Sequence, residues 1–197
     1  MKKTKETADG AGSNMFVVHG PYEVPHVLIP EPNPRKVYKV AEGSELTKIW
    51  KAVGDHKKGA SIATKDGIYI FAMRAARGHR PWYVGKAGSS LKKEVFTGDK
   101  VKDYNEVLAA NERGTPVLFF ITNESATRKH IRKEQLKRLE GDLILHAKRK
   151  NPGLKNKNLT TDPYAWHILG ISGRQAKPSA AVNKFKTMMG CCTSCGA

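Results

Sequence analysis

Two tyrosines flanked by glycines are the first residues whose types and spacing indicate binding chemistry. Tyr69 ends the run Gly67-Ile68-Tyr69, and Tyr83 begins the run Tyr83-Val84-Gly85. Both runs are short, apolar and β-prone, so they are expected to pair as a hairpin with the tyrosines near each other. Glycine inside a strand often marks the close approach of a ligand or of another backbone. The alternative is that the tyrosines form a cross-strand aromatic pair that only packs.

Glu140 is a carboxylate beside the apolar stripe of a predicted basic helix. The residues of that stripe recur at i, i+3 and i+4, and they are Leu136, Leu139, Leu143, Ile144 and Ala147. Burying an unpaired carboxylate is costly, so a residue at this position is expected to have a cation or a metal ion as its partner. The alternative partner is a neighbour on the same helix, Lys137 or Arg138.

Positive charge dominates the composition. The chain carries 35 Lys and Arg against 18 Asp and Glu, a formal net charge of +17. This surplus favours a polyanionic partner, because each neutralised phosphate releases condensed counterions. Residues 128–158 hold eleven Lys or Arg against three carboxylates, which indicates a surface that follows phosphates without reading bases. The alternative is a highly soluble basic protein that binds nothing acidic.

The elements that must position these residues form an α+β pattern. Strands are predicted at residues 67–73, 82–85 and 115–121, each short and rich in β-prone residues. A helix is expected from about Lys129 to Lys150, with Asn151-Pro152-Gly153 ending it. Residues 91–110 are expected to be helical, with a break at Thr97-Gly98-Asp99.

Simpler segments are predicted on either side of this central block. Residues 1–14 have the composition of a disordered leader. Residues 15–60 are an expected N-terminal extension, with a proline-rich stretch lying extended on a surface and one short helix at residues 44–53. Residues 161–197 are an expected C-terminal extension, with a last strand at 166–171, a short helix at 180–189 and a flexible tail.

A cytoplasmic protein without membrane contact is the expectation from the remaining features. The sequence shows no apolar run of about 18 residues and no signal-peptide core after its basic start. Cys191, Cys192 and Cys195 are odd in number and crowd into the tail, where they cannot cross-link a core, and this fits a reducing compartment.

The two glycine–tyrosine runs together resemble the signature of the GIY-YIG nucleases. The resemblance covers roughly residues 62–160. Lys86 directly follows the second run, Glu140 lies on a long helix after the third strand, and Asn156 follows that helix. The resemblance implies a nuclease domain over residues 61–160, with a small three-stranded antiparallel sheet flanked by helices.

The resemblance also implies a single-metal hydrolysis of DNA phosphodiester bonds. Glu140 would hold one Mg²⁺ or Mn²⁺ ion. Tyr69, with its pKa lowered by Lys86 or the metal, would orient or deprotonate the attacking water. Tyr83 would hydrogen-bond a phosphate oxygen, and Asn156 would steady the phosphate or the glutamate. Duplex DNA is the expected partner, and the cations expected on its backbone are Arg74, Arg77, Arg80, Lys92, Lys148, Arg149 and Lys155.

The family's arginine in the helix after the second run is the main departure. Aligning on Leu91 puts Glu94 in its place, so Lys92 and Lys93 are the nearby cations able to substitute. Residues one apart on a helix point about 100° apart, and we expect Lys93 to face the site and Glu94 to turn away. Two further functions stay open: a nucleic-acid-binding protein that has lost cleavage, and an accessory module that binds a protein partner.

Overall fold

The computed structural model describes residues 15–30, 36–54, 61–76, 78–111, 113–124, 131–156 and 179–190. Its main sheet is antiparallel, with strand order β1-β6-β4-β5. The strands are β1 (Phe16–Glu23), β4 (Gly67–Ala75), β5 (Gly78–Ala87) and β6 (Thr115–Asn123). Strand β4 is central, and its first seven residues are all buried. The predicted α+β class is therefore observed.

The prediction of a three-stranded sheet was wrong by one strand. Strand β1 comes from the N-terminal extension and pairs along β6. Phe16 and Val18 point into the core, with 0% and 4% of their surface exposed, as alternate residues of a half-buried strand do. Pro21 within this strand and the prolines after it hid the strand in the sequence, because they indicate an extended surface segment rather than sheet.

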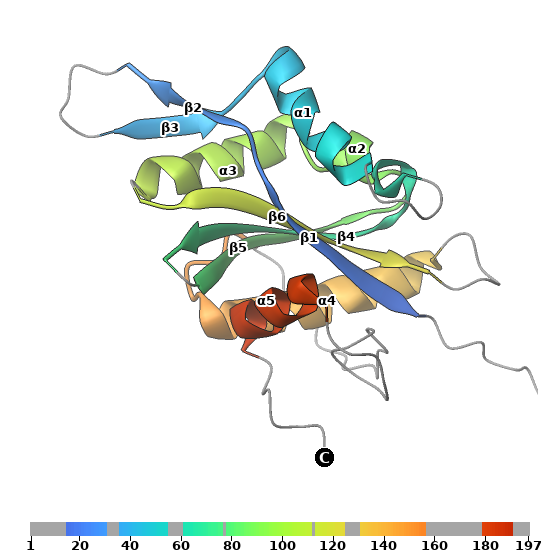
Figure 1. The fold of residues 1–197 in the computed structure, drawn as a ribbon. Coiled ribbons are helices and arrows are strands. Elements are labelled where there is room, and N and C mark those ends of the chain that lie inside the picture. The colour runs from blue at the N-terminus through green and yellow to red at the C-terminus, as the bar shows by residue number, and fades with distance from the viewer. Residues whose placement is uncertain are drawn as a thin grey trace, which may run out of the picture.

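Helices cover both faces of the main sheet, as Figure 1 shows. On one face lie α4 (Lys133–Lys150) and α5 (Ala180–Met189), which pack on β4, β5 and β1. On the other lie α1 (Gly43–Gly54), α2 (Leu91–Glu94) and α3 (Gly98–Ala110). Each face has its own apolar cluster, and all five residues of the predicted α4 stripe are buried in the first. The functional residues of β5 therefore stand between two helical layers.

The predicted helices occur with shifted ends. Helix α4 begins at Lys133 rather than near Lys129, because Arg132 is its extended N-cap. The helical region after β5 breaks at Thr97, as expected, into α2 and α3. Helices α1 and α5 match the two short helices predicted in the extensions. The predicted strand at 166–171 and the three cysteines lie outside the described residues.

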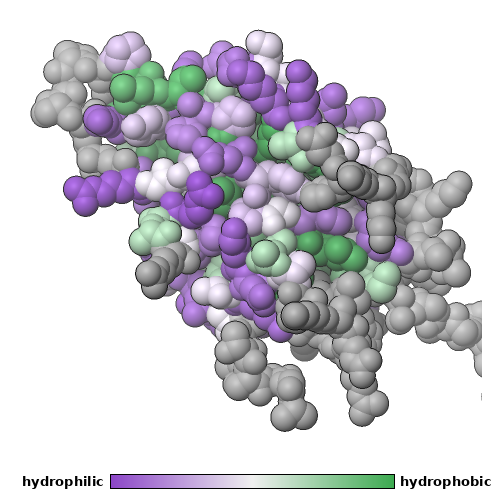
Figure 2. All heavy atoms as spheres, in the orientation of Figure 1, coloured by the Kyte–Doolittle hydropathy of each residue, from purple (hydrophilic) through white to green (hydrophobic). Residues whose placement is uncertain are grey.

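A two-stranded ribbon stands away from the sheet. It consists of β2 (His26–Ile29) and β3 (Val37–Val40), and α3 holds its base, because the Asn105 side chain accepts a hydrogen bond from the Val40 amide at 2.8 Å. Leu28 is 51% exposed, and Figure 2 shows apolar atoms at this ribbon on an otherwise hydrophilic end. No helix within the described ranges is long and apolar enough to cross a membrane.

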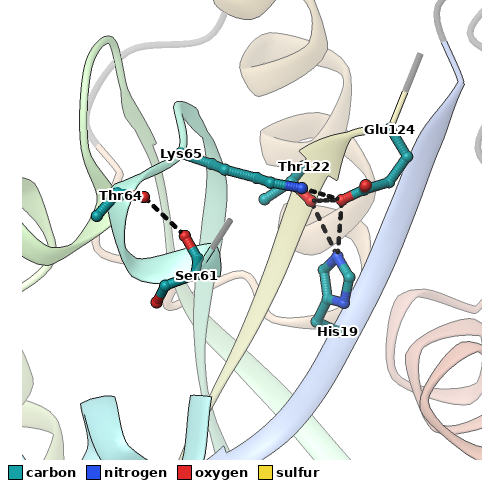
Figure 3. Close-up of polar contacts among 6 residues, drawn as sticks. All are labelled: His19, Ser61, Thr64, Lys65, Thr122 and Glu124. Atoms are coloured by element: carbon teal, nitrogen blue, oxygen red, sulfur yellow. Dashed lines mark hydrogen bonds and ion pairs between the residues drawn. The ribbon is translucent and has the colours of Figure 1, made fainter. Parts of the chain in front are cut away.

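A polar cluster ties β1 to β6 where the two strands begin and end (Figure 3). The Lys65 ammonium donates to the Glu124 carboxylate at 2.6 Å, and the Thr122 hydroxyl donates to the same oxygen at 2.9 Å. Partial burial alone would raise the pKa of Glu124, but these two donors outweigh it and the pKa is lowered. His19 of β1 reaches Thr122 at 2.9 Å, so the cluster joins the N-terminal strand to the rest of the sheet.

A candidate active site at the edge of strand β5

A cleft of about 620 Å³ runs along the free edge of β5, between α3 and α4. Successive residues of a strand point to opposite faces, so Tyr83 stands on the α3 side and Lys86 on the α4 side. Four of the six predicted catalytic residues line this cleft: Tyr83, Lys86, Glu140 and Asn156. Residues far apart in the sequence thus converge at one place.

Tyr69 and Tyr83 stack beside each other, but they differ in access. Their ring centroids are 6.1 Å apart and the rings lie within 20° of parallel. Tyr69 is opposite Gly85 in the strand register, and a Cβ at Gly85 would overlap the Tyr69 ring. The glycine therefore makes room for this tyrosine. Tyr69 is fully buried, whereas Tyr83 is partly exposed and lines the cleft.

Both tyrosines hold their protons firmly. Burial, followed by nearby Glu140 and Asp103, raises the pKa of Tyr83 to about 12. Burial raises the pKa of Tyr69 further, and the carboxylates of Glu94 and Glu140 act in the same direction. The expectation that Lys86 lowers the pKa of Tyr69 is therefore not met, because Lys86 is paired elsewhere.

The Tyr69 hydroxyl is buried without a hydrogen-bond partner among the described residues. The Tyr69 hydroxyl lies close enough to Tyr83 to lower the pKa of that residue. The two hydroxyls nevertheless do not form a hydrogen bond with each other. A buried hydroxyl without a partner destabilises the fold by about 1–3 kcal/mol. A buried group of this kind calls for an explanation, such as a bound water, an ion or a ligand.

Glu140 has a cation partner from the sheet. The Lys86 ammonium donates to its carboxylate at 2.5 Å, and the glutamate side chain is 17% exposed. The alternative of a pair within the helix, with Lys137, is not what the structure shows. Within the described ranges no three His, Cys, Asp or Glu side chains gather closely enough to hold a metal ion. A metal at Glu140 would therefore not be enclosed by three such side chains of the described residues.

Asn156 performs a different task from the one predicted. Its amide donates to the Val84 carbonyl at 2.7 Å and accepts from the Val84 amide at 2.9 Å. Both ends of the side chain are thus used on the β5 backbone, and neither reaches Glu140. The Lys155 amide adds a bond to the Trp82 carbonyl at 2.9 Å. Lys155 and Asn156 thus bond to the edge of β5 at Trp82 and Val84, the two residues on either side of Tyr83, and hold Tyr83 in place.

Asn151 adds a second contact to the same strand edge. It is fully buried, and its amide donates to the Pro81 carbonyl at 2.7 Å while accepting from Arg80 at 3.0 Å. We did not predict this residue from the sequence, where Asn151-Pro152-Gly153 signalled only the end of a helix. The cleft residues Asp99, Asp103 and Glu106 were missed as well, although their i, i+4, i+7 spacing places them on one face of α3.

Lys93 and Glu94 are placed opposite to expectation. Lys93 is exposed and does not line the cleft. The Glu94 carboxylate instead lies close enough to raise the pKa values of Tyr69 and Tyr83, and it pairs with Lys100 at 3.9 Å. The position that resembles the family's arginine thus presents negative charge towards the tyrosines.

The residues expected on the DNA backbone are divided between the cleft and other surfaces. Lys155 lines the cleft and pairs with Glu106 at 2.6 Å, and Arg74 pairs with Glu23 at 3.2 Å. Arg80 lies over the Trp82 ring at 5.2 Å. Lys92 and Arg149 are exposed, Lys148 is partly buried, and Arg77 lies outside the described residues.

Comparison of the chain with known protein families, curated proteins and solved structures found no match. The chemistry of the cleft therefore has to be argued from its residues.

The clamp formed by Asn156 yields a direct test. Replacing Asn156 with Asp removes the donor to the Val84 carbonyl and sets a negative charge beside it. We expect the free energy of unfolding to fall by about 1–3 kcal/mol, measured by urea denaturation. The matched control is Asn183→Asp on the exposed side of α5, expected to change stability by less than about 0.5 kcal/mol. Unchanged stability in Asn156→Asp would show that the amide does not hold the strand edge.

Proposed function

We propose that this protein is a metal-dependent endonuclease that hydrolyses DNA phosphodiester bonds by a GIY-YIG-type mechanism. The observation that carries the proposal is the convergence of Tyr83, Lys86 and Glu140 in one cleft, with the unsatisfied Tyr69 hydroxyl behind them. A hydroxyl donor, an ammonium and a carboxylate are the groups needed to bind a phosphate together with a cation.

Glu140 fits the role of metal ligand. Carboxylate oxygens suit Mg²⁺ and Mn²⁺, and Mg²⁺ keeps several waters while taking one or two carboxylates and substrate phosphates. The Glu140 carboxylate in an open cleft fits this mode of Mg²⁺ binding. When bound, the ion would neutralise charge on the scissile phosphate. Lys86 would then be free of Glu140 and able to contact a phosphate oxygen.

The tyrosines act as hydrogen-bond donors in this proposal. A pKa of about 12 keeps Tyr83 protonated at neutral pH, and the raised pKa of Tyr69 does the same. Tyr83 lines the cleft and would donate to a phosphate oxygen, the role expected from the sequence. Tyr69 lies behind it, so its hydroxyl would complete a donor pair once a substrate oxygen or an ordered water comes within reach.

The proposal is tested by incubating the pure protein with supercoiled plasmid, with and without Mg²⁺. We expect metal-dependent nicking by the parent protein and loss of it in Glu140→Gln, while DNA binding stays nearly unchanged because the basic surface is intact. The control is Glu134→Gln, an exposed carboxylate in the first turn of the same helix. Cleavage by Glu140→Gln at more than about a tenth of the parent rate would contradict the metal role.

Tyr69 and Tyr104 form a matched pair for a second prediction. Both are fully buried, and both hydroxyls have no partner in the described part of the chain. Replacing either with Phe should stabilise the fold by about 1 kcal/mol, because a desolvated hydroxyl is removed. That corresponds to a rise of roughly 2–4 °C in the thermal midpoint.

Only Tyr69→Phe should impair cleavage, by about 10²-fold. Burial raises the pKa of Tyr69, and Tyr83 and Glu140 lie close enough to its hydroxyl to raise that pKa further. Tyr104 instead packs on Phe71 with ring centroids 4.2 Å apart, and Glu140 is not among the groups that shift its pKa. Equal cleavage by both variants would reduce Tyr69 to sheet packing.

A nucleic-acid-binding protein without cleavage is a second candidate, and the placement of Glu94 favours it. A carboxylate directed at the tyrosines repels a phosphate, whereas arginine would bind it with two donors.

Glu94→Arg distinguishes the two candidates. In an active nuclease this change should raise the plasmid nicking rate about tenfold or more, because it replaces repulsion with a bidentate donor. Lys93→Ala, at the exposed neighbouring position, should leave the rate unchanged. A protein that has lost cleavage for other reasons would show no nicking in either variant. A sharp loss in Lys93→Ala would show that this lysine reaches the substrate.

A further inference from the structure

The positive charge of this protein is not concentrated in the cleft. The charged residues lining it are four lysines (Lys86, Lys102, Lys137 and Lys155) and four carboxylates (Asp99, Asp103, Glu106 and Glu140). Two of the lysines are held in ion pairs, Lys86 with Glu140 and Lys155 with Glu106. A cleft of balanced charge offers a polyanion little net attraction. The phosphate-binding charge implied by the +17 total must therefore lie elsewhere.

One end of the molecule collects cations from four elements. We define the basic end as Arg74 of β4, Arg80 of β5, Arg149 and Lys150 of α4, and Lys184 of α5. Figure 1 shows the end of α4 and helix α5 beneath the turn of the β4–β5 hairpin. Among the described residues Arg80, Arg149, Lys150 and Lys184 make no ion pair, and Arg74 alone is paired, with Glu23.

Several contacts bring these cations together. Asn151 accepts from Arg80 at 3.0 Å, so the end of α4 is held against the hairpin. The Lys150 side chain lies against Gly190, the left-handed cap of α5, leaving no room for a Cβ there. Helix α5 packs on β5, which brings Lys184 to the hairpin that carries Arg74. Burial lowers the pKa of His79 in this hairpin, and the charges of Lys184 and Arg74 lower it further. Lys184 of α5 therefore lies near the cations of α4 and of the hairpin.

A path of suitable length leads from the cleft to this end. Lys137, Gly141 and Ile144 line the cleft at i, i+4 and i+7, and Lys148 continues the same face of α4. Glu140 and Lys150 are ten residues apart, which is about 15 Å along a helix. Successive phosphates along one strand of duplex DNA are separated by about 3.4 Å of helix axis, so this distance corresponds to roughly four or five nucleotides.

We propose that the basic end is a binding surface for the phosphate backbone of duplex DNA, separate from the cleft, and that it supplies most of the affinity. Helix α5 is part of this surface through Lys184. The proposal goes beyond the cutting chemistry and does not depend on it, since the basic end holds none of the residues assigned to cleavage.

The test measures binding of a fluorescein-labelled 20-base-pair duplex by fluorescence anisotropy over a series of NaCl concentrations, in EDTA so that no cutting occurs. The double variant Lys150→Gln/Lys184→Gln should bind more weakly. The slope of log affinity against log salt should become shallower by about 1.8, because each lost phosphate contact contributes about 0.9. Both lysines are exposed, so the thermal midpoint should stay unchanged.

The matched control is Lys36→Gln/Lys51→Gln, which removes the same charge from exposed positions before β3 and on α1. It should keep the parent slope. An equal change in both double variants would overturn the proposal, because net charge alone would then explain binding. An unchanged slope in Lys150→Gln/Lys184→Gln would also overturn it.

If that variant does not fold, Lys184→Gln alone should make the slope shallower by about 0.9. Loss of binding to phosphatidylserine vesicles with DNA binding intact would assign the surface to membranes instead.

Discussion

Strand β5 has to serve as the edge of the sheet and as the wall of a cleft, and the site depends on how its backbone groups are satisfied. An unpaired edge strand presents a row of amides and carbonyls that invite another strand. A fifth strand would satisfy them but would fill the cleft. Here two asparagine side chains and one amide bind the backbone at Pro81, Trp82 and Val84, so the edge is closed by groups small enough to leave Tyr83 and Lys86 accessible. The positions of Tyr83 and Lys86 follow from this solution, because a strand held at Pro81, Trp82 and Val84 is fixed in its register.

Polar groups with little access to water gather around the same strand. The Tyr69 hydroxyl is buried without a partner, and Glu140 is shielded from water by the helix and sheet that hold it. A core chosen for stability alone would have Phe at position 69, and the strand would lose nothing in packing. Gly85 belongs to the same arrangement, since its missing side chain admits the Tyr69 ring. Departures from the rules of a satisfied core are expected where function requires them. The ion pair of Lys86 with Glu140 limits the cost, because each charge is compensated while no ligand is bound.

Local patterns in the sequence were enough to find the centre of the site. The paired glycine–tyrosine runs, the apolar stripe of α4 and the carboxylate beside it are all short-range signals, and they indicated Tyr83 and Glu140. Lys86 was indicated by the resemblance to the GIY-YIG nucleases. Strand β1 was missed, because Pro21 interrupts its brief alternation and its partner β6 lies about a hundred residues away. The direction of Glu94 could not be read from the sequence either. Helix α2 has four residues, and its rotation is set by Leu91 and Val95 packing in the core rather than by periodicity. The sequence indicated Asn156 as a site residue but did not indicate its role, because a sequence does not show which backbone groups a side chain will contact.

The distribution of charge between the cleft and the basic end bears on where a phosphate backbone would bind. In a cleft of four lysines and four carboxylates, a phosphate gains little until a cation joins Glu140. Within the described residues the cations of the basic end other than Arg74 make no ion pair, so in our proposal they hold a DNA backbone at any metal concentration. In our proposal, long-range attraction brings DNA to the basic end, and the cleft engages it only when a bound cation makes the net charge of the cleft positive. In this proposal DNA is bound mainly at the basic end and is cut in the cleft. Tight binding at the basic end therefore does not stabilise the ground state of the reacting phosphate in the cleft. Helix α4 makes the separation possible, because it carries Glu140 in its middle and Lys150 at its end on one rigid element.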